Sequence, residues 1–178
     1  MKPVIAALGA CLIATAAHAD QRIFSYDPAD APTRQRVDQG LTLVMDKGLF
    51  GVTVREVLAT QARATAILEP AYERDLGDRL DRILPKGAWG SDVYLITDRE
   101  QGPGMVRAFC PGSDKGWLVI TPPKARRPLV VHALGADPAN GKARHCATLN
   151  LTFRGEWKLP DLGSLPKMQP VPPPTRPF

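Results

Sequence analysis

Apolar and polar residues alternate along the chain from Leu41 onward, as in a strand with one buried face. Leu41, Leu43 and Met45 share one face, and a glycine-bracketed turn at 48–51 leads to a run with valines at 52, 54 and 57. This pattern predicts a β-hairpin. A third strand is predicted over residues 63–69.

A helix over residues 54–68 is the alternative for part of this region. Several apolar side chains between those positions also fit helical spacing. The β-branched residues and Pro70 at the end of the run favour strands instead.

The segment 72–84 carries the clearest helical pattern of the chain. Four apolar side chains recur at helical spacing, namely Leu76, Leu80, Ile83 and Leu84. Acidic residues open the segment, Arg82 lies near its end, and Pro85 follows. Gly77 counts against a continuous helix, since an interior glycine costs about 1 kcal/mol relative to alanine.

The rest of the chain predicts short strands separated by turns rich in glycine, proline and aspartate. Their ranges are 22–26 (as an edge strand), 92–97, 105–110, 117–121, 128–134 and 144–154, and a helical turn is predicted over 33–38. The predicted fold is therefore mainly β. We expect one small antiparallel β-sandwich or barrel over residues 20–158, with one amphipathic helix.

The first nineteen residues have the pattern of an export signal. A basic start at Lys2 precedes an apolar run to Ala17, and a small-x-small site ends at Ala19. The run is shorter than the ~20 residues that span a bilayer. Lipid attachment at Cys11 is a weaker alternative. We therefore expect a periplasmic or secreted protein with no transmembrane segment in the mature chain.

Cleavage after Ala19 would leave two cysteines, Cys110 and Cys146. In an oxidising compartment, one disulfide is the simplest prediction for such a pair. A metal site that adds His132 and His145 is a weaker alternative, because His145 and Cys146 are adjacent and would point to opposite faces of a strand. A cysteine nucleophile is a further weak alternative, and we expect no metal and no cofactor.

The alternation in the last strand leaves the position of Cys146 open. Ala147, Leu149 and Leu151 share a face with His145, whereas Cys146 falls on the polar face. Either the disulfide lies on the outer face, or a bulge near Cys146 breaks the alternation.

Basic residues are concentrated in the second half of the chain. Residues 20–100 hold 11 basic and 14 acidic side chains, a net charge of 11 − 14 = −3, whereas residues 101–178 hold 11 and 4, a net charge of 11 − 4 = +7. This asymmetry makes an anionic surface, lipid or polysaccharide, a candidate partner. The candidate contacts are Lys124, Arg126, Arg127, Lys142 and Arg144. The export signal and the modest net charge make nucleic acid an unexpected partner.

Three apolar residues in glycine-rich turns are candidate contacts for a partner protein: Leu49, Phe50 and Trp89. Residues 159–178 lose all periodicity, and five of the last twelve residues are prolines. We expect an extended, proline-rich tail outside the core.

The sequence has no nucleophile elbow, phosphate-binding loop, dinucleotide fingerprint or zinc-protease motif. The favoured hypothesis is an exported, non-catalytic binding or accessory protein of the bacterial cell envelope, with an unknown envelope protein as its partner. The alternatives are a small exported enzyme of hydrolase type, whose site is not visible in the sequence, and a binder of anionic surfaces.

Overall fold

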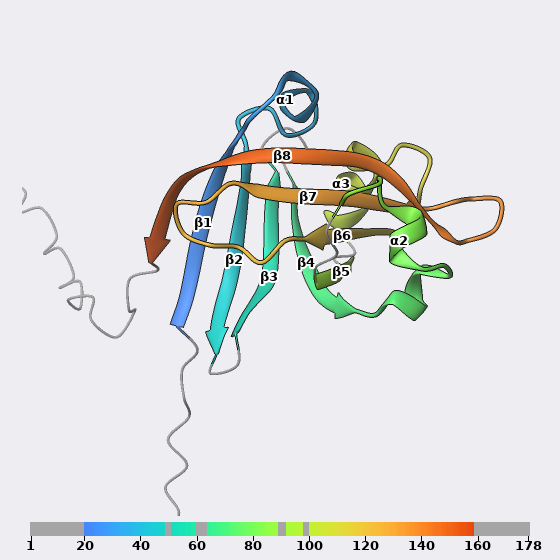
Figure 1. Ribbon diagram of the computed structural model, residues 1–178, viewed down its shortest axis with the longest axis horizontal. Coiled ribbons are helices and arrows are strands. Elements are labelled where there is room, and N and C mark those ends of the chain that lie inside the picture. The colour runs from blue at the N-terminus through green and yellow to red at the C-terminus, as the bar shows by residue number, and fades with distance from the viewer. Residues whose placement is uncertain (1–19, 49–50, 60–63, 89–91, 98–99, 159–178) are drawn as a thin grey trace, which may run out of the picture.

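The computed structural model describes residues 20–48, 51–59, 64–88, 92–97 and 100–158. In these residues eight strands form a closed antiparallel barrel, and each strand pairs with the next along the chain. The last strand pairs with the first and closes the barrel (Figure 1). The predicted mainly β fold is thus confirmed, and the barrel is the correct one of the two architectures.

The elements follow one another in a simple order. The strands are β1 (Asp20–Pro28), β2 (Leu41–Gly48), β3 (Gly51–Ala59), β4 (Ala64–Ala71), β5 (Asp92–Ile96), β6 (Gly116–Ile120), β7 (Leu129–Ala136) and β8 (Ala143–Lys158). The helices are α1 (Ala31–Val37), the 3₁₀ helix η1 (Glu73–Leu76), α2 (Leu80–Ile83) and α3 (Gly102–Phe109).

The predicted hairpin is confirmed as β2 and β3, which pair from Leu41 opposite Ala59 to Gly48 opposite Gly51. The third predicted strand is β4, so the helical alternative over 54–68 is wrong. β1 is longer than predicted and is no edge strand, because it pairs with β2 on one side and with β8 on the other.

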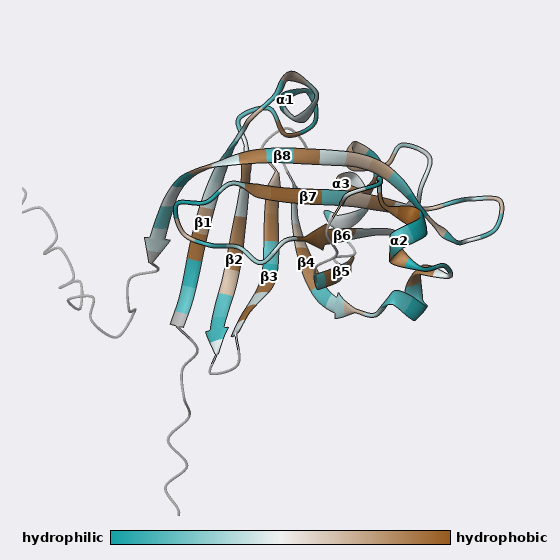
Figure 2. Ribbon diagram, in the orientation of Figure 1, coloured by the Kyte–Doolittle hydropathy of each residue, from teal (hydrophilic) through white to brown (hydrophobic). Residues whose placement is uncertain are grey.

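Apolar side chains fill two layers, one inside the barrel and one on its outer wall. β6 shows both layers, since all five of its residues are buried. Leu118 and Ile120 belong to the interior cluster, whereas Trp117 and Val119 pack in the outer cluster. Figure 2 shows the hydrophobic residues gathered in the central parts of the strands. A strand buried on both faces loses its alternation and reads as a continuous apolar run.

The predicted helix over 72–84 is wrong as a continuous element. Gly77 has a φ of 72° and ends η1, and Arg79 is extended before α2 begins. The periodicity still identified the buried side chains, because Leu76 and Leu84 both pack in the outer cluster. This segment therefore covers the barrel wall as two short turns.

The strand predicted over 105–110 is also wrong, because those residues belong mostly to α3. Pro103 lies in the first turn of this helix, where its fixed φ is compatible with helix and its missing N–H is not needed. Met105, Val106 and Phe109 then fall on one helical face and pack in the interior cluster. The described residues of the barrel thus include three α-helices; α1 confirms the helical turn predicted over 33–38, whereas α3 was not predicted.

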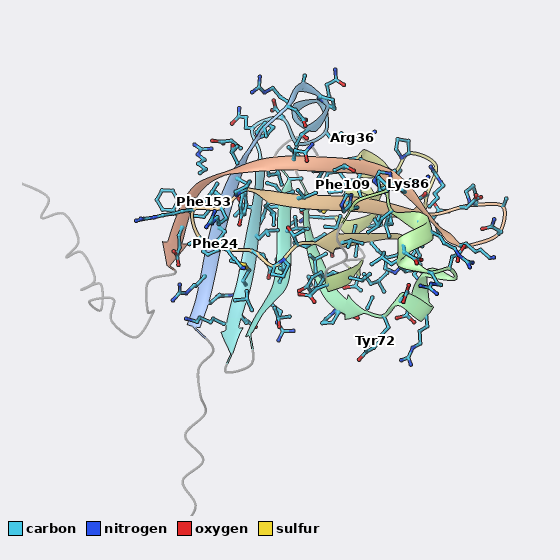
Figure 3. All side chains as sticks on the ribbon, in the orientation of Figure 1. Phe24, Arg36, Tyr72, Lys86, Phe109 and Phe153 are labelled. Carbon is cyan, nitrogen blue, oxygen red and sulfur yellow. A yellow bond between two sulfur atoms is a disulfide. The ribbon has the colours of Figure 1, made fainter. Side chains whose placement is uncertain are left out.

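Connections alternate between the two ends of an antiparallel barrel. The end that carries α1 and α3 is called the α3 end, and the end at which Gly48 of β2 lies opposite Gly51 of β3 is called the hairpin end. At the α3 end, the Arg36 guanidinium of α1 donates to the carbonyl oxygen of Phe109 at 3.0 Å. Figure 3 shows both labelled residues on this side of the molecule.

A bulge in β8 decides between the two positions left open for Cys146. Ala147 lies opposite Ala133, but His145 lies opposite the next residue, Leu134, so Cys146 is the extra residue of β8. The bulge turns Cys146 toward α3, where it forms the predicted disulfide with Cys110.

Both predicted terminal segments, residues 1–19 and 159–178, lie outside the described residues. Within the part of the chain that the structure describes, no helix has the length and apolar character needed to cross a membrane.

Candidate binding cleft

The barrel wall opens between β3 and β4 toward the hairpin end. The two strands pair only from Glu56 to Ala59 of β3 and from Ala64 to Ile67 of β4. Beyond Ile67, β4 pairs with β5 alone, from Leu68 to Ala71. Figure 1 shows β3 and β4 diverging in this direction. Among the described residues, one side of each strand therefore has no ladder partner there.

Two local features of the sequence account for the opening. Arg55 is an extra residue in β3, because Val44 lies opposite Glu56 whereas Met45 lies opposite Val54. Such a bulge bends its strand and increases the local twist. On the facing strand, Pro70 has no N–H, so it cannot donate to a ladder with β3.

The opening forms a cleft of about 860 Å³, within the usual size of ligand sites. Its walls combine apolar and charged side chains from β2, β3, β4, β5, η1 and α2. The lining residues that carry the argument below are Asp46, Val52, Arg55, Tyr72, Glu73 and Asp92.

Tyr94 forms the inner wall of the cleft. Its buried hydroxyl accepts a hydrogen bond from the backbone N–H of Val54 at 3.3 Å, across the line where the ladder is interrupted. Burial raises the pKa of the Tyr94 hydroxyl; the hydrogen bond with Val54 and the charge of Arg55 oppose this effect only in part, and the Asp92 carboxylate adds to it. The hydroxyl therefore stays protonated at neutral pH and links β3 to β5 across the cleft.

The charged groups of the cleft leave an excess of negative charge. Arg55 pairs with Asp46 at 2.7 Å. Glu73 accepts a hydrogen bond from the backbone N–H of Leu80 at 2.6 Å and so fixes the start of α2. Asp92 is exposed and has no ion pair with any residue in the described ranges. Three carboxylates and one guanidinium give the lining a net charge of −2.

An aromatic side chain stands at the rim of the cleft. Tyr72 is 64% exposed, and the guanidinium carbon of Arg74 lies 4.7 Å from the centre of its ring. Figure 3 shows Tyr72 projecting away from the barrel at its lower edge. Sequence reasoning missed Tyr72, although an aromatic residue just after a strand and before an acidic turn is an available signal.

The three apolar residues expected to contact a partner, Leu49, Phe50 and Trp89, lie outside the described residues. The flanking Gly48 and Gly51 both line the cleft.

The five basic residues expected to contact an anionic surface fall at two places. Lys124, Arg126 and Arg127 belong to the β6–β7 connection, whereas Lys142 and Arg144 lie at the β7–β8 connection. These connections are at opposite ends of β7 (Figure 1). Arg144 also donates to the carbonyl oxygen of Pro111 at 2.9 Å, which ties β8 to the segment after α3.

The two histidines lie together on the outer face of the barrel. The Thr148 hydroxyl oxygen is 3.1 Å from His132 Nδ1 and 3.1 Å from His145 Nε2. Burial lowers the pKa of both imidazoles; the neighbouring His145 lowers that of His132 further, and Arg36 lowers that of His145. The expectation that His145 shares a face with Ala147 is wrong, because the bulge at Cys146 separates them.

These positions also bear on the alternative metal site. The sulfur atoms of Cys110 and Cys146 are joined to each other, and the imidazoles are bonded to Thr148. Among the described residues, no group of three or more histidine, cysteine, aspartate or glutamate side chains has a metal-binding arrangement.

No family model, no curated protein and no solved structure matches this chain.

Proposed function

We propose that this protein is an exported, non-catalytic binding or accessory protein of the bacterial cell envelope, and that it holds its partner in the cleft between β3 and β4. The observation that carries the proposal is the interrupted ladder. β3 and β4 stop pairing at Glu56 and Ile67, and from there toward the hairpin end β3 pairs with β2 alone while β4 pairs with β5 alone. An open strand edge beside a mixed apolar and charged cleft is a common setting for protein recognition.

The roles of the cleft carboxylates support binding over catalysis. Asp46 is held by Arg55, and Glu73 is held by the start of α2. Acid–base catalysis by carboxylates needs environments that drive their pKa values apart, usually in a sheltered site. Asp92 is exposed to solvent and suits the recognition of a charged partner better.

Site-specific photo-crosslinking in the producing cells tests this proposal. A photoreactive residue at Val52, on the cleft wall, should give a discrete adduct with an envelope protein. The same residue at Arg107, exposed on α3 at the other end of the barrel, is the control. Adducts that are identical at both positions, or no adduct at Val52, would contradict a partner in the cleft.

A second candidate function is binding to an anionic surface through the β6–β7 connection. Three of its cations are exposed on this one loop, and Arg126 and Arg127 border a shallow hollow of about 490 Å³ beside Phe153. Phe153 packs edge-on against Phe24 at 5.5 Å between ring centres, so the loop lies over a rigid aromatic cluster (Figure 3).

Binding of the protein to anionic phospholipid vesicles at increasing salt tests this second function. Replacing Lys124, Arg126 and Arg127 by glutamine should abolish salt-sensitive binding, since such contacts are electrostatic. Replacement of Lys142, at the α3 end, is the control. Equal binding of the triple variant and the unchanged protein would exclude this loop.

A further inference from the structure

Toward the cleft, the backbone of β3 over residues 51–55 has no ladder partner among the described residues. In an antiparallel pair, residues alternate between positions that exchange hydrogen bonds with the partner strand and positions whose N–H and C=O point away from it. The Val54 N–H points away from β2, because it donates to Tyr94. Val52 lies two residues earlier on the same ladder, opposite Lys47. Both main-chain groups of Val52 and the carbonyl of Val54 therefore face the cleft.

The opposite wall does not compete for these groups. Along residues 68–71, the edge of β4 that faces away from the cleft forms the ladder with β5. Just before this ladder, the Thr97 N–H donates a hydrogen bond to the Ile67 carbonyl oxygen at 3.0 Å. Pro70 faces β3 without an N–H. Residues 51–55 of β3 have β2 on one side and no described strand on the cleft side. This part of β3 spans about 17 Å at ~3.4 Å per residue. That length accommodates a short extended strand.

The net negative charge of the cleft lining favours extended segments that carry positive charge. The carboxylates exceed the guanidinium by two, and Asp92 has no cationic partner among the described residues. A segment with lysine or arginine side chains therefore complements this cleft.

From these contacts we infer that the cleft binds an extended, basic peptide segment of a partner protein, which adds to β3 as an additional strand. The inference rests on the proposed function and specifies the partner's chemistry. The peptide backbone hydrogen-bonds to the N–H and carbonyl of Val52 and to the carbonyl of Val54, and its cationic side chains lie near Asp92. This is strand addition at an open sheet edge, with specificity supplied by side-chain charge.

Fluorescence anisotropy with the full chain and labelled synthetic peptides tests the inference. A peptide of about six residues that alternates valine and lysine matches the length of the open β3 edge. It should bind saturably, whereas its glutamate counterpart should not. Methylating alternate backbone nitrogens should weaken binding about thirtyfold, because two hydrogen bonds of about 1 kcal/mol each are lost.

Protein variants test the role of charge. Asp92→Lys should weaken binding of the lysine peptide by about fivefold or more, because an attraction becomes a repulsion. Asp114→Lys makes the same change on an exposed loop at the α3 end and should leave the affinity unchanged. Thermal unfolding checks that both variants fold.

Equal affinity for the methylated peptide would overturn strand addition, and equal affinity for the glutamate peptide would overturn the assigned charge. Absence of saturable peptide binding would overturn the inference as a whole. If Val52 nevertheless crosslinks to an envelope protein in cells, the proposed function stands without this ligand class. The two proposals can therefore fail separately.

Discussion

At the scale of single residues, Gly135 allows the segment after α3 to lie directly on β7. A Cβ atom at this position would overlap Ser113 Oγ and would lie 2.7 Å from the Cβ of Cys110. Because Cys110 is also fixed by the disulfide, the segment cannot move away freely. We expect Gly135→Ala to lower the free energy of unfolding by about 1–3 kcal/mol, measured by urea denaturation.

Gly104→Ala is the matched control, because a Cβ there meets nothing within 4 Å. It should be neutral or stabilise α3 by up to about 1 kcal/mol, since alanine is the better helix former. Equal destabilisation by both substitutions would show that the close approach at Gly135 is unimportant.

Also at the residue scale, the two histidines should make stability depend on pH. Burial holds the folded pKa of His132 and His145 below the ordinary value of 6.5. As the pH falls below 6.5, the unfolded chain binds protons that the folded chain does not, so the free energy of unfolding decreases. Their full contribution is present above this pH.

Denaturant titrations at several pH values between about 7.5 and 5 measure this decrease. His132→Gln keeps a polar side chain but removes one titrating group, and should flatten the dependence. Hydrogen bonds to Thr33 and Asn150 lower the pKa of Asp30, so this carboxylate changes the free energy of unfolding only in more acid solution. An unchanged slope in the variant would contradict the assignment.

At the scale of elements, the disulfide joins α3 to β8. The bonded cysteines are 36 positions apart, and closing a loop of that length stabilises a fold by about 4 kcal/mol on the chain-entropy model. Replacing both cysteines by serine should lower the free energy of unfolding by up to that amount. Thiol labelling of the unfolded, unreduced protein should find neither cysteine reactive.

The double variant should also lose its response to reductant, whereas the unchanged protein should be destabilised by it. Reactive thiols at both positions before reduction would contradict the bond. An unchanged unfolding midpoint in the double variant would show that α3 docks through its apolar face alone.

The sequence predicts an element correctly where one face of that element is buried and the opposite face is less buried. The alternation of Leu41, Leu43 and Met45 located β2 correctly, because its other face is less buried. α3 was missed because a short helix with both a glycine and a proline in its first turn resembles a loop followed by a strand. Its spacing of Met105, Val106 and Phe109 is helical, but over eight residues the two periods are hard to separate.

At the scale of the whole molecule, the cleft was not predictable, because it depends on the point where two strands stop pairing. Two signals for it are local, the bulge at Arg55 and the proline at position 70. The third is the register of β3 against β4, which only the closed barrel determines. Register likewise placed His145 on the outer face, against the simple alternation of β8.

Closure of the barrel depends on the last strand, and truncation tests this dependence. Every residue of β8 that pairs with β1 lies between Leu151 and Lys158. Ending the chain after Asn150 removes all of these pairs and also removes Phe153, which packs against Phe24 and Tyr26. We expect this truncated chain to lose its cooperative thermal transition, because a barrel opened at this seam exposes its apolar interior to water.

Ending the chain after Lys158 is the control, since it removes the proline-rich tail and keeps every pair between β1 and β8. Its thermal midpoint should equal that of the full chain. A cooperative transition in the shorter truncation would show that β1 to β7 fold without closure, whereas a lowered midpoint in the control would give the tail a structural role. β3 and β4 already diverge at one place in the barrel wall. Loss of the β1–β8 ladder would open the wall at a second place, so this ladder is needed to keep the apolar interior away from water.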